Sequence, residues 1–243
     1  MKPPHSRVRK PALHLALVSI LTMLLVSAAS LGIYVYRIIA ATPSVEEYES
    51  AQSRTSSPGS SGVRPPTDVS IDDVPSSVIH AVVAIEDRRF FQHRGIDLRG
   101  IVRAAWENLQ AGRIVQGAST ITQQLARTRY LSLERTLERK IAEGYLALQL
   151  EMRYDKAQIL EMYLNSVYFG AGATGVQAAS QRFFGKPVEE VNTTEAAMLA
   201  GSLRSPRHYN PVTNPQRAKR RLSVVLAAME SAGVTSADQA MDF

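Results

Sequence analysis

The sequence predicts a mainly α-helical domain preceded by one membrane-spanning helix. One observation is an unbroken apolar run near the N-terminus. The other is that, after residue 70, apolar residues recur at spacings of three and four in several segments. No stretch of any length alternates apolar and polar residues as a half-buried strand does, although a short hairpin remains open. With 243 residues, 45% of them hydrophobic, the chain is long enough for one anchored domain with its own core.

The N-terminal segment combines a basic tail with a candidate anchor. Residues 1–12 carry four positive side chains, and from Leu13 to Tyr36 the chain is almost entirely apolar. A helix of that length spans roughly 36 Å, at about 1.5 Å per residue, which is enough for the hydrocarbon core of a bilayer. Basic residues before such a run predict a cytoplasmic N-terminus and an exported C-terminal part. We therefore predict a single-pass anchor over residues 13–37 in the inner (cytoplasmic) membrane, with the domain on its outer, periplasmic face.

A cleaved signal peptide is the alternative to an anchor, because the Ser-Ala-Ala sequence at residues 27–29 is an acceptable cleavage site. The apolar run continues well past that site, which favours a retained anchor. Residues 42–69 are rich in Ser, Gly and Pro and hold almost no large apolar residue, so they are predicted to be a linker. The globular domain is assigned to residues 70–243.

Apolar periodicity predicts helices within the domain. They cover residues 74–85, 98–109, 137–152, 159–167 and 195–203. The first of them has Pro75 in its first turn, and Thr193 or Thr194 is the expected N-terminal cap of the last.

The distribution of charge limits the classes of ligand. The formal net charge is +6, and the basic N-terminus is followed much later by a second basic group. Its members are Arg204, Arg207, Arg217, Lys219, Arg220 and Arg221. Such groups suit phosphates, whether in lipid head groups, nucleic acids or pyrophosphates. Sparse aromatic residues and the lack of a nucleic-acid-binding motif argue against nucleic acid. The sequence has no cysteine, which excludes disulfides and thiolate metal sites.

The stretch AIEDRRFFQHRGID, residues 84–97, sets two carboxylates at the end of an apolar run and beside two phenylalanines. An apolar wall raises the pKa of a carboxyl group and makes it a better base, so the pair Glu86 and Asp87 marks a candidate catalytic site. A charged helix end explains the same pattern.

Two further polar stretches are candidates for binding. GASTITQQLARTRYL, residues 117–131, offers hydroxyls and amides followed by two arginines, which suits a sugar that carries a phosphate. An ordinary capped helix N-terminus is the structural alternative. In LERTLERKIAEGYLALQLE, residues 133–151, Arg139 and Lys140 precede Glu143 by four and three residues and share one helical surface with it. They form either a solvated ion-pair face or a phosphate site with a second carboxylate.

Together these stretches resemble the peptidoglycan glycosyltransferases of family 51, which include the N-terminal module of class A penicillin-binding proteins and the monofunctional transglycosylases. EDRRFFQHRG is similar to the family's E-D-x-x-F-x-x-H-x-G element, GASTITQQ to G-x-S-T-x-T-Q-Q, and RKIAE to R-K-x-x-E. ILEMYLNSVYFGAGATGVQAAS and EAAMLAGSLRSPRHYNP resemble the fourth and fifth elements. The five elements occur in the family's order over about residues 70–230.

The resemblance implies a lysozyme-like glycosyltransferase domain that polymerises lipid II into β-1,4-linked glycan strands, with inversion and release of undecaprenyl pyrophosphate. It implies Glu86 as the catalytic base and Glu143 as a second catalytic carboxylate. The implied contacts to substrate sugars and phosphates are Ser119, Thr120, Gln123, Gln124, Arg127, Arg135, Arg139, Lys140 and Asn165. The implied structural residues are Asp87, Phe90, His93 and Gly95.

The implied partners are lipid II, the growing glycan strand and the bilayer, with other cell-wall synthesis proteins as further candidates. No cofactor is required by the sequence, while a divalent ion (Mg or Mn) held by Glu143 remains open. The family's apolar region that dips into the membrane is expected near residues 113–124. Arg127-Thr128 stands where the family usually has Lys-Asn; since arginine keeps the charge, phosphate binding is expected to survive with altered geometry.

Two alternatives to polymerisation remain at this point. A lysozyme-like lytic enzyme would cleave glycan instead of making it, but it would not need the cationic set of Arg127, Arg135 and Lys140. An inactive scaffold in the wall-synthesis complex would not need Glu86 and Glu143. The sequence has no Ser-x-x-Lys element, so we expect no transpeptidase module in this chain. Whether a longer protein continues past its last residue stays open.

Overall fold

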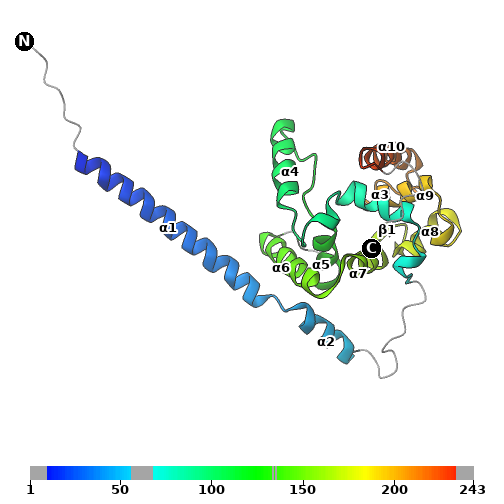
Figure 1. Ribbon diagram of the computed structural model, residues 1–243, viewed down its shortest axis with the longest axis horizontal. Helices are drawn as coiled ribbons and strands as arrows, with labels where there is room; N and C mark the ends of the chain where they lie inside the picture. Colours follow the sequence, from blue (N-terminus) through cyan, green and yellow to red (C-terminus); the bar gives the residue numbers. More distant parts are fainter. Residues whose placement is uncertain (1–9, 56–67, 133, 135, 234–243) are drawn as a thin grey trace, which may run out of the picture. The chain divides into compact units, whose positions relative to one another are not determined.

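The computed structural model describes residues 10–55, 68–132, 134 and 136–233, and it is mainly helical (Figure 1). Contacts divide the chain into two units, residues 1–43 and 44–243. The α-helices are α1 Lys10–Ala41, α2 Val45–Thr55, α3 Ser76–Glu86, α4 Leu98–Ala111, α5 Ile121–Tyr130, α6 Leu137–Arg153, α7 Lys156–Ser166, α8 Val176–Phe184, α9 Thr193–Leu203 and α10 Pro215–Ser231. The short elements are three 3-10 turns, Ile71–Asp73, Phe90–Gln92 and Val188–Glu190, and the strands β1 Tyr168–Gly170 and β2 Ala173–Thr174. The predicted mainly α fold is confirmed, and the strands supply the short hairpin that the sequence left open.

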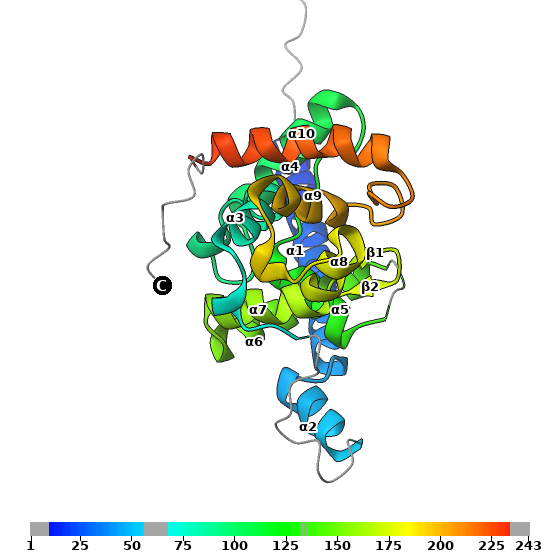
Figure 2. The same ribbon diagram turned by 90° about the vertical axis from the view of Figure 1, so that its right-hand side faces the viewer.

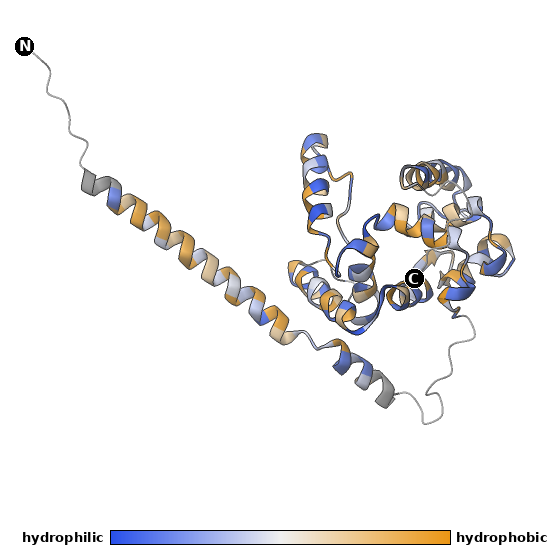
Figure 3. Cartoon of the chain, in the orientation of Figure 1, coloured by the Kyte–Doolittle hydropathy of each residue, from blue (hydrophilic) through white to orange (hydrophobic). Residues whose placement is uncertain are grey.

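The first unit contains α1, which is apolar along most of its length (Figure 3). Within the described part of the chain it is the helix long and apolar enough to cross a membrane. Its 32 residues exceed the roughly 20 that a bilayer core requires. The predicted span, residues 13–37, lies inside this helix.

Helix α2 corrects the prediction that residues 42–69 form a linker. Val45 is buried, and its N–H donates to Oε1 of Gln149 in α6 at 2.9 Å. The carboxylate of Glu49 accepts hydrogen bonds from the hydroxyls of Tyr154 at 2.7 Å and Tyr130 at 3.3 Å. The linker prediction is therefore wrong for α2, which belongs to the domain. Local composition did not reveal this, because its partners lie about 80 to 105 positions further along the chain.

The domain is built from two groups of helices that share one core. Helices α3, α9 and α10 pack against one another, and α5 packs against α6 and α7. Figure 2 shows α10 crossing over α9 and α3. The largest fully buried side chains are Tyr163, Phe90 and Phe169. Glu86 is the last residue of α3, so the packing of α3 against α9 and α10 fixes the place of its carboxylate.

The N-terminal ends of two helices differ from the prediction. Asn192, not Thr193 or Thr194, caps α9: its side chain accepts the N–H of Glu195 at 3.0 Å, and the Glu195 carboxylate accepts the Asn192 N–H at 2.9 Å. Two reciprocal bonds make a capping box, which satisfies two N–H groups that a helix start otherwise leaves free. Pro75 lies at the cap position just before α3 instead of within its first turn.

Helix α4 forms where the sequence predicts it, but its apolar stripe is exposed and only Gly100 and Ala104 are buried. The helix projects from the rest of the domain (Figure 1). The exposed apolar side chains are Leu98, Ile101, Val102, Trp106 and Leu109, together with Ile114 just beyond the helix. This exposed apolar surface lies mainly on α4 and reaches residues 113–124 only at Ile114. The membrane-contacting region expected near residues 113–124 stays a prediction.

In α6 the buried face also differs from the apolar stripe. Leu137, Leu148 and Met152 of the predicted stripe are exposed. The buried residues are Ala142, Glu143, Gly144, Leu146, Ala147 and Leu150. Because several of these are small, α5 and the segment before α4 can approach the helix closely: a Cβ added to Gly144 would lie 3.5 Å from the Ile96 side chain. The buried face of α6 therefore carries a charged residue of the third motif into the interior.

Candidate active site

Glu86 lies at the centre of the candidate site. The Gln124 side chain of α5 donates a hydrogen bond from Nε2 to Oε2 of Glu86 at 2.9 Å. The hydroxyl of Tyr163 in α7 donates to Oε1 of the same Gln124 side chain at 3.3 Å. Side chains of α5 and α7 thus orient the carboxylate at the end of α3. Because the group that binds Glu86 is the neutral side-chain amide of Gln124, the carboxylate can still act as a base.

The surroundings of Glu86 raise its pKa. Burial is the largest cause, because it penalises the charged form of the carboxyl group. The Gln124 hydrogen bond and the charges of Arg221, Arg204 and Arg127 act in the opposite direction and lower the pKa, but they do not cancel the effect of burial. A carboxylate with a raised pKa is a stronger base at neutral pH than a free glutamate.

Asp87 connects the first motif to the start of α5. Its carboxylate contacts Nε2 of His93 at 3.0 Å and accepts the N–H of Ile121 at 3.0 Å. With 7% of its surface exposed, Asp87 is held as a bracing residue next to the candidate base. Gly95 lets this segment approach α6: it has φ +80°, and an added Cβ would lie 2.8 Å from the carbonyl oxygen of Ala147. Phe90 is fully buried, under the ammonium group of Lys156 at 4.3 Å.

Three residues that the resemblance implies as substrate contacts make hydrogen bonds within the fold. Thr120 and Gln123 form the capping box of α5, with 2% and 5% of their surfaces exposed. Thr120 also donates from its hydroxyl to the carbonyl oxygen of Gly95 at 2.6 Å. The Asn165 side chain makes two hydrogen bonds to the backbone of Val69, at 3.1 and 2.8 Å. In this structure their hydrogen-bonding groups serve the fold, and their contact with substrate stays a prediction.

A second charged cluster lies on α6 around Glu143, whose surface is 1% exposed. Arg139 Nη1 lies 2.8 Å from Oε1 of Glu143, and Lys140 Nζ lies 2.7 Å from Oε2. The same ammonium group donates to the hydroxyl of Ser119 at 2.8 Å. Glu143 therefore holds Lys140, which is partly exposed, in a fixed position beside the second motif. The burial of Glu143 contradicts a solvated ion-pair face.

This cluster does not fit a divalent metal ion. Both carboxylate oxygens of Glu143 lie within 2.8 Å of a cationic group, although Oε1 makes no hydrogen bond. Among the described residues, no three His, Asp or Glu side chains gather as metal ligands. A divalent ion prefers several oxygen ligands without competing ammonium or guanidinium groups.

The remaining predicted cations divide between the two centres. Arg127 lies on α5, one turn after Gln124, and its charge reaches Glu86. Arg135 lies outside the described residues. The structure also brings Arg204 and Arg221 within electrostatic reach of Glu86. The sequence placed both in a basic group without a function, because they are far from residue 86 along the chain and their electrostatic effect on it is not visible there. Tyr163 lies in the helix predicted over residues 159–167 and in the family's fourth element; its place in that element is the signal for a polar role.

Replacing Gln124 with Leu tests this electrostatic account of the base. The change removes a hydrogen bond that lowers the pKa of Glu86, so that pKa should rise further. A base works only when deprotonated, so the acid limb of the kcat/KM–pH profile should move to higher pH, and activity should recover as the pH is raised. Gln181→Leu, at an exposed position of α8, is the matched control. An unmoved limb, or one moved to lower pH, contradicts the account.

Comparison with known proteins gives one consistent result. Residues 59–230 match the model of the transglycosylase family. The chain is 51% identical over 181 residues to penicillin-binding protein 1A of Aquifex aeolicus, a match that covers 74% of this chain and 25% of that protein. It is 46% identical over 171 residues to penicillin-binding protein 1A of Escherichia coli, covering 70% and 20%. It is 42% identical over 173 residues to penicillin-binding protein 1F of Bacillus subtilis, covering 71% and 24%. The chain thus spans a quarter or less of the length of these curated relatives.

Proposed function

The chain belongs to the transglycosylase family, and from this membership and the site geometry we propose that its domain polymerises lipid II into peptidoglycan glycan strands. The lysozyme-like fold class expected from the motifs follows from the same membership. The observation that carries the proposal is the environment of Glu86: a carboxylate with a raised pKa, oriented by Gln124 and lying among the charges of three arginines. Such a site combines a base with groups that attract an anionic substrate.

In the proposed reaction, the 4-hydroxyl of the acceptor's N-acetylglucosamine attacks the anomeric carbon of the donor's N-acetylmuramic acid. The new carbon–oxygen bond forms while the bond from that carbon to the diphosphate oxygen breaks, so the configuration inverts. Glu86 accepts the hydroxyl proton, and the bonding electrons leave with undecaprenyl pyrophosphate. A sugar hydroxyl is a weak nucleophile at neutral pH, which is why proton removal during attack lowers the barrier.

The leaving diphosphate gains negative charge as its bond to the sugar breaks. Positive groups already in place stabilise that charge in the transition state without a cost of reorganisation. Lys140, held by Glu143 and Ser119, fits this role, and Arg127 adds charge on the neighbouring helix. Arg135 matches the family's third cationic position. Glu143 then acts by holding Lys140 and Arg139 in place.

The membrane has two proposed contacts with the chain. The apolar α1 spans the bilayer with its N-terminus in the cytoplasm, which places the domain on the outer face of the inner membrane. The exposed apolar surface of α4 contacts the same bilayer, because apolar side chains there gain burial in lipid that the domain does not provide. A lipid-linked substrate and an anchored enzyme then meet on one surface, which raises their effective concentration.

A lytic enzyme is the one alternative that a specific observation also favours, because a carboxyl group with a raised pKa can serve as a general acid in glycan cleavage. Incubating the full chain with lipid II in lipid vesicles, and separately with purified sacculi, distinguishes the two. We expect glycan polymer from lipid II, no soluble fragments from sacculi, and much weaker polymerisation when lipid and detergent are omitted. Fragments from sacculi without polymer would establish the lytic function instead.

A further inference from the structure

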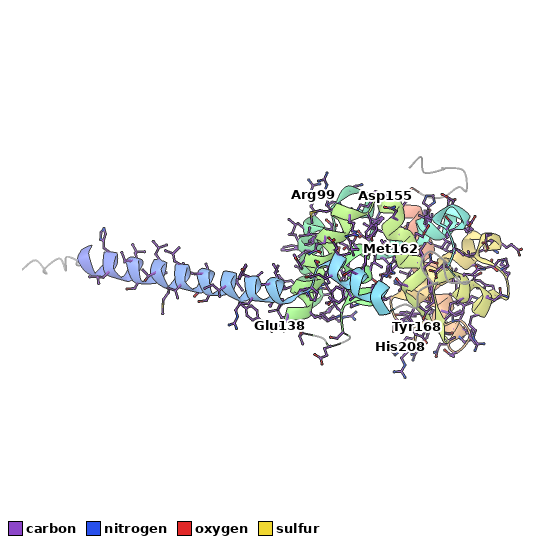
Figure 4. All side chains as sticks on the ribbon, turned by 90° about the horizontal axis from the view of Figure 1, so that it is seen from below. Arg99, Glu138, Asp155, Met162, Tyr168 and His208 are labelled. Carbon is purple, nitrogen blue, oxygen red and sulfur yellow. The ribbon has the colours of Figure 1, made fainter. Side chains whose placement is uncertain are left out.

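Four of the six residues of the second basic group line a cavity of about 560 Å³ at the end of α9 and along α10. The residues that line it are Arg204, Ser205, His208, Tyr209, Arg217, Arg220, Arg221 and Val224. We call it the arginine pocket. Figure 4 shows His208 at the periphery of the domain. Because Arg204, Arg217 and Arg220 are exposed as well, the pocket is accessible from outside. The proposed function uses the charges of Arg204 and Arg221 near Glu86 but assigns no ligand to the pocket that they line.

Packing holds the walls of the arginine pocket in place. Gly201 lets α10 approach α9: an added Cβ would lie 3.2 Å from the Arg221 side chain. The guanidinium of Arg221 lies 5.7 Å from the centre of the Tyr209 ring. Arg204 donates from Nη2 to the carbonyl oxygen of Val115 at 3.0 Å, which connects the pocket to the segment before α5. The Ser205 hydroxyl lies 2.9 Å from Nδ1 of His208.

The guanidinium groups of the arginine pocket make no direct ion pair within the described residues, although the charge of Glu86 acts on Arg204 and Arg221 from a distance. None of the residues that line the pocket is acidic, and none of its four guanidiniums pairs with a described carboxylate. Burial, and then the neighbouring charge of Arg204, lower the pKa of Arg221. Like charges held close together disfavour one another, and an anion between them removes that cost. The preferred ligand of such a pocket is a phosphate or diphosphate, which guanidinium groups bind in two-point fashion.

The arginine pocket is close to the candidate base. Helix α3, which ends at Glu86, packs against both α9 and α10. The charges of Arg204 and Arg221 reach Glu86 from this side, whereas that of Arg127 comes from α5. The arginine pocket on one side and Arg127 on the other therefore both act on the carboxylate of Glu86.

We propose that the arginine pocket binds the diphosphate of the acceptor lipid, while Lys140 and its neighbours bind the diphosphate that leaves the donor. This inference rests on the proposed function, in which both substrates are lipid-linked diphosphates. The acceptor keeps its diphosphate one disaccharide away from the hydroxyl that Glu86 deprotonates. A pocket beside Glu86 that retains an anion therefore holds the acceptor with its hydroxyl at the base. It also selects acceptors that still carry the diphosphate.

The double variant Arg217→Gln/Arg220→Gln tests the proposal in the full chain. Both residues are exposed on α10, and neither is among the groups that shift the pKa of Glu86, so folding and the base should be preserved. A preformed lipid-linked tetrasaccharide serves as donor at a fixed saturating concentration, and lipid II is varied as acceptor in phosphatidylcholine vesicles. We expect the KM for lipid II to rise at least about tenfold, because charge-assisted contacts are lost, with kcat changed by less than about twofold.

Lys219→Gln is the matched control, since Lys219 is exposed on the same helix, carries the same charge and does not line the pocket. A double variant that matches the control overturns the inference but leaves the polymerase function standing. A wild-type chain that makes no polymer overturns the proposed function itself. Phosphatidylglycerol vesicles supply the second source of phosphate: a KM defect that occurs only with this anionic lipid shows a headgroup site and also overturns the inference.

Discussion

Glu86→Gln is expected to lower kcat for lipid II polymerisation by about 10² to 10⁴-fold, the usual contribution of a positioned general base. Glutamine has nearly the same shape and can still accept the Gln124 hydrogen bond, so the change removes the basicity while preserving the packing at the end of α3. The measurement is a continuous polymerisation assay with the full chain in lipid vesicles. The melting temperature, recorded in parallel, should be unchanged or higher, because a partly buried charge has been removed.

Glu189→Gln is the matched control for this substitution. Glu189 is exposed in the 3-10 turn Val188–Glu190, and no described cation pairs with it. It should keep wild-type activity. Retention of more than a few percent of activity by Glu86→Gln would rule out this carboxylate as the base, and the assignment of the whole site would then fail.

Glu143→Ala has the second largest expected effect, and it acts on stability as well as activity. The substitution leaves the partly buried guanidinium of Arg139 without a carboxylate and frees Lys140 from its position. Removing one partner of a buried ion pair costs several kcal/mol; because the Lys140 side chain is 43% exposed, we discount this to about 2–4 kcal/mol. For a domain of this size the melting temperature should fall by roughly 5–15 °C. Activity should fall too, since Lys140 loses its fixed place.

A second variant separates the two effects of Glu143. In Glu143→Leu/Arg139→Met both members of the pair become apolar, so no unpaired charge is buried, and most of the stability should return while activity stays low. Glu230→Ala, at an exposed position of α10, controls for the loss of one carboxylate from a helix. If Glu143→Ala melted like the wild type, the cluster would not support α6, and its proposed role in holding Lys140 would be wrong.

Much of the secondary structure follows from local sequence patterns. The apolar run that became α1, and the spacings of three and four that became α4, α6 and α7, depend only on neighbouring residues, and the structure has helices at all of them. The first and third motifs were likewise visible in the sequence, because a carboxylate pair beside apolar residues and the spacing Arg-Lys-x-x-Glu are local patterns. Periodicity did not reveal what covers each face. The stripes of α4 and α6 were apolar and yet exposed.

The roles of individual polar residues could not be predicted in the same way. Thr120 and Gln123 have the chemistry of sugar ligands and equally that of a capping box, and the position of α5 in the fold determines which role they take. Glu49 was assigned to a linker because its partners, two tyrosine hydroxyls, are distant in sequence.

The sequence by itself determined the helical class and the membrane-length apolar helix, since both depend on residue type and short-range spacing, and its resemblance to family 51 implied which carboxylate is the candidate base. Only the tertiary structure decided which groups surround that base. Arg204 and Arg221 lie more than a hundred positions from Glu86 and reach it because α3 packs against α9 and α10. The pKa of a carboxyl group depends on burial and on charges nearby in space, and neither is a property of adjacent residues in the chain.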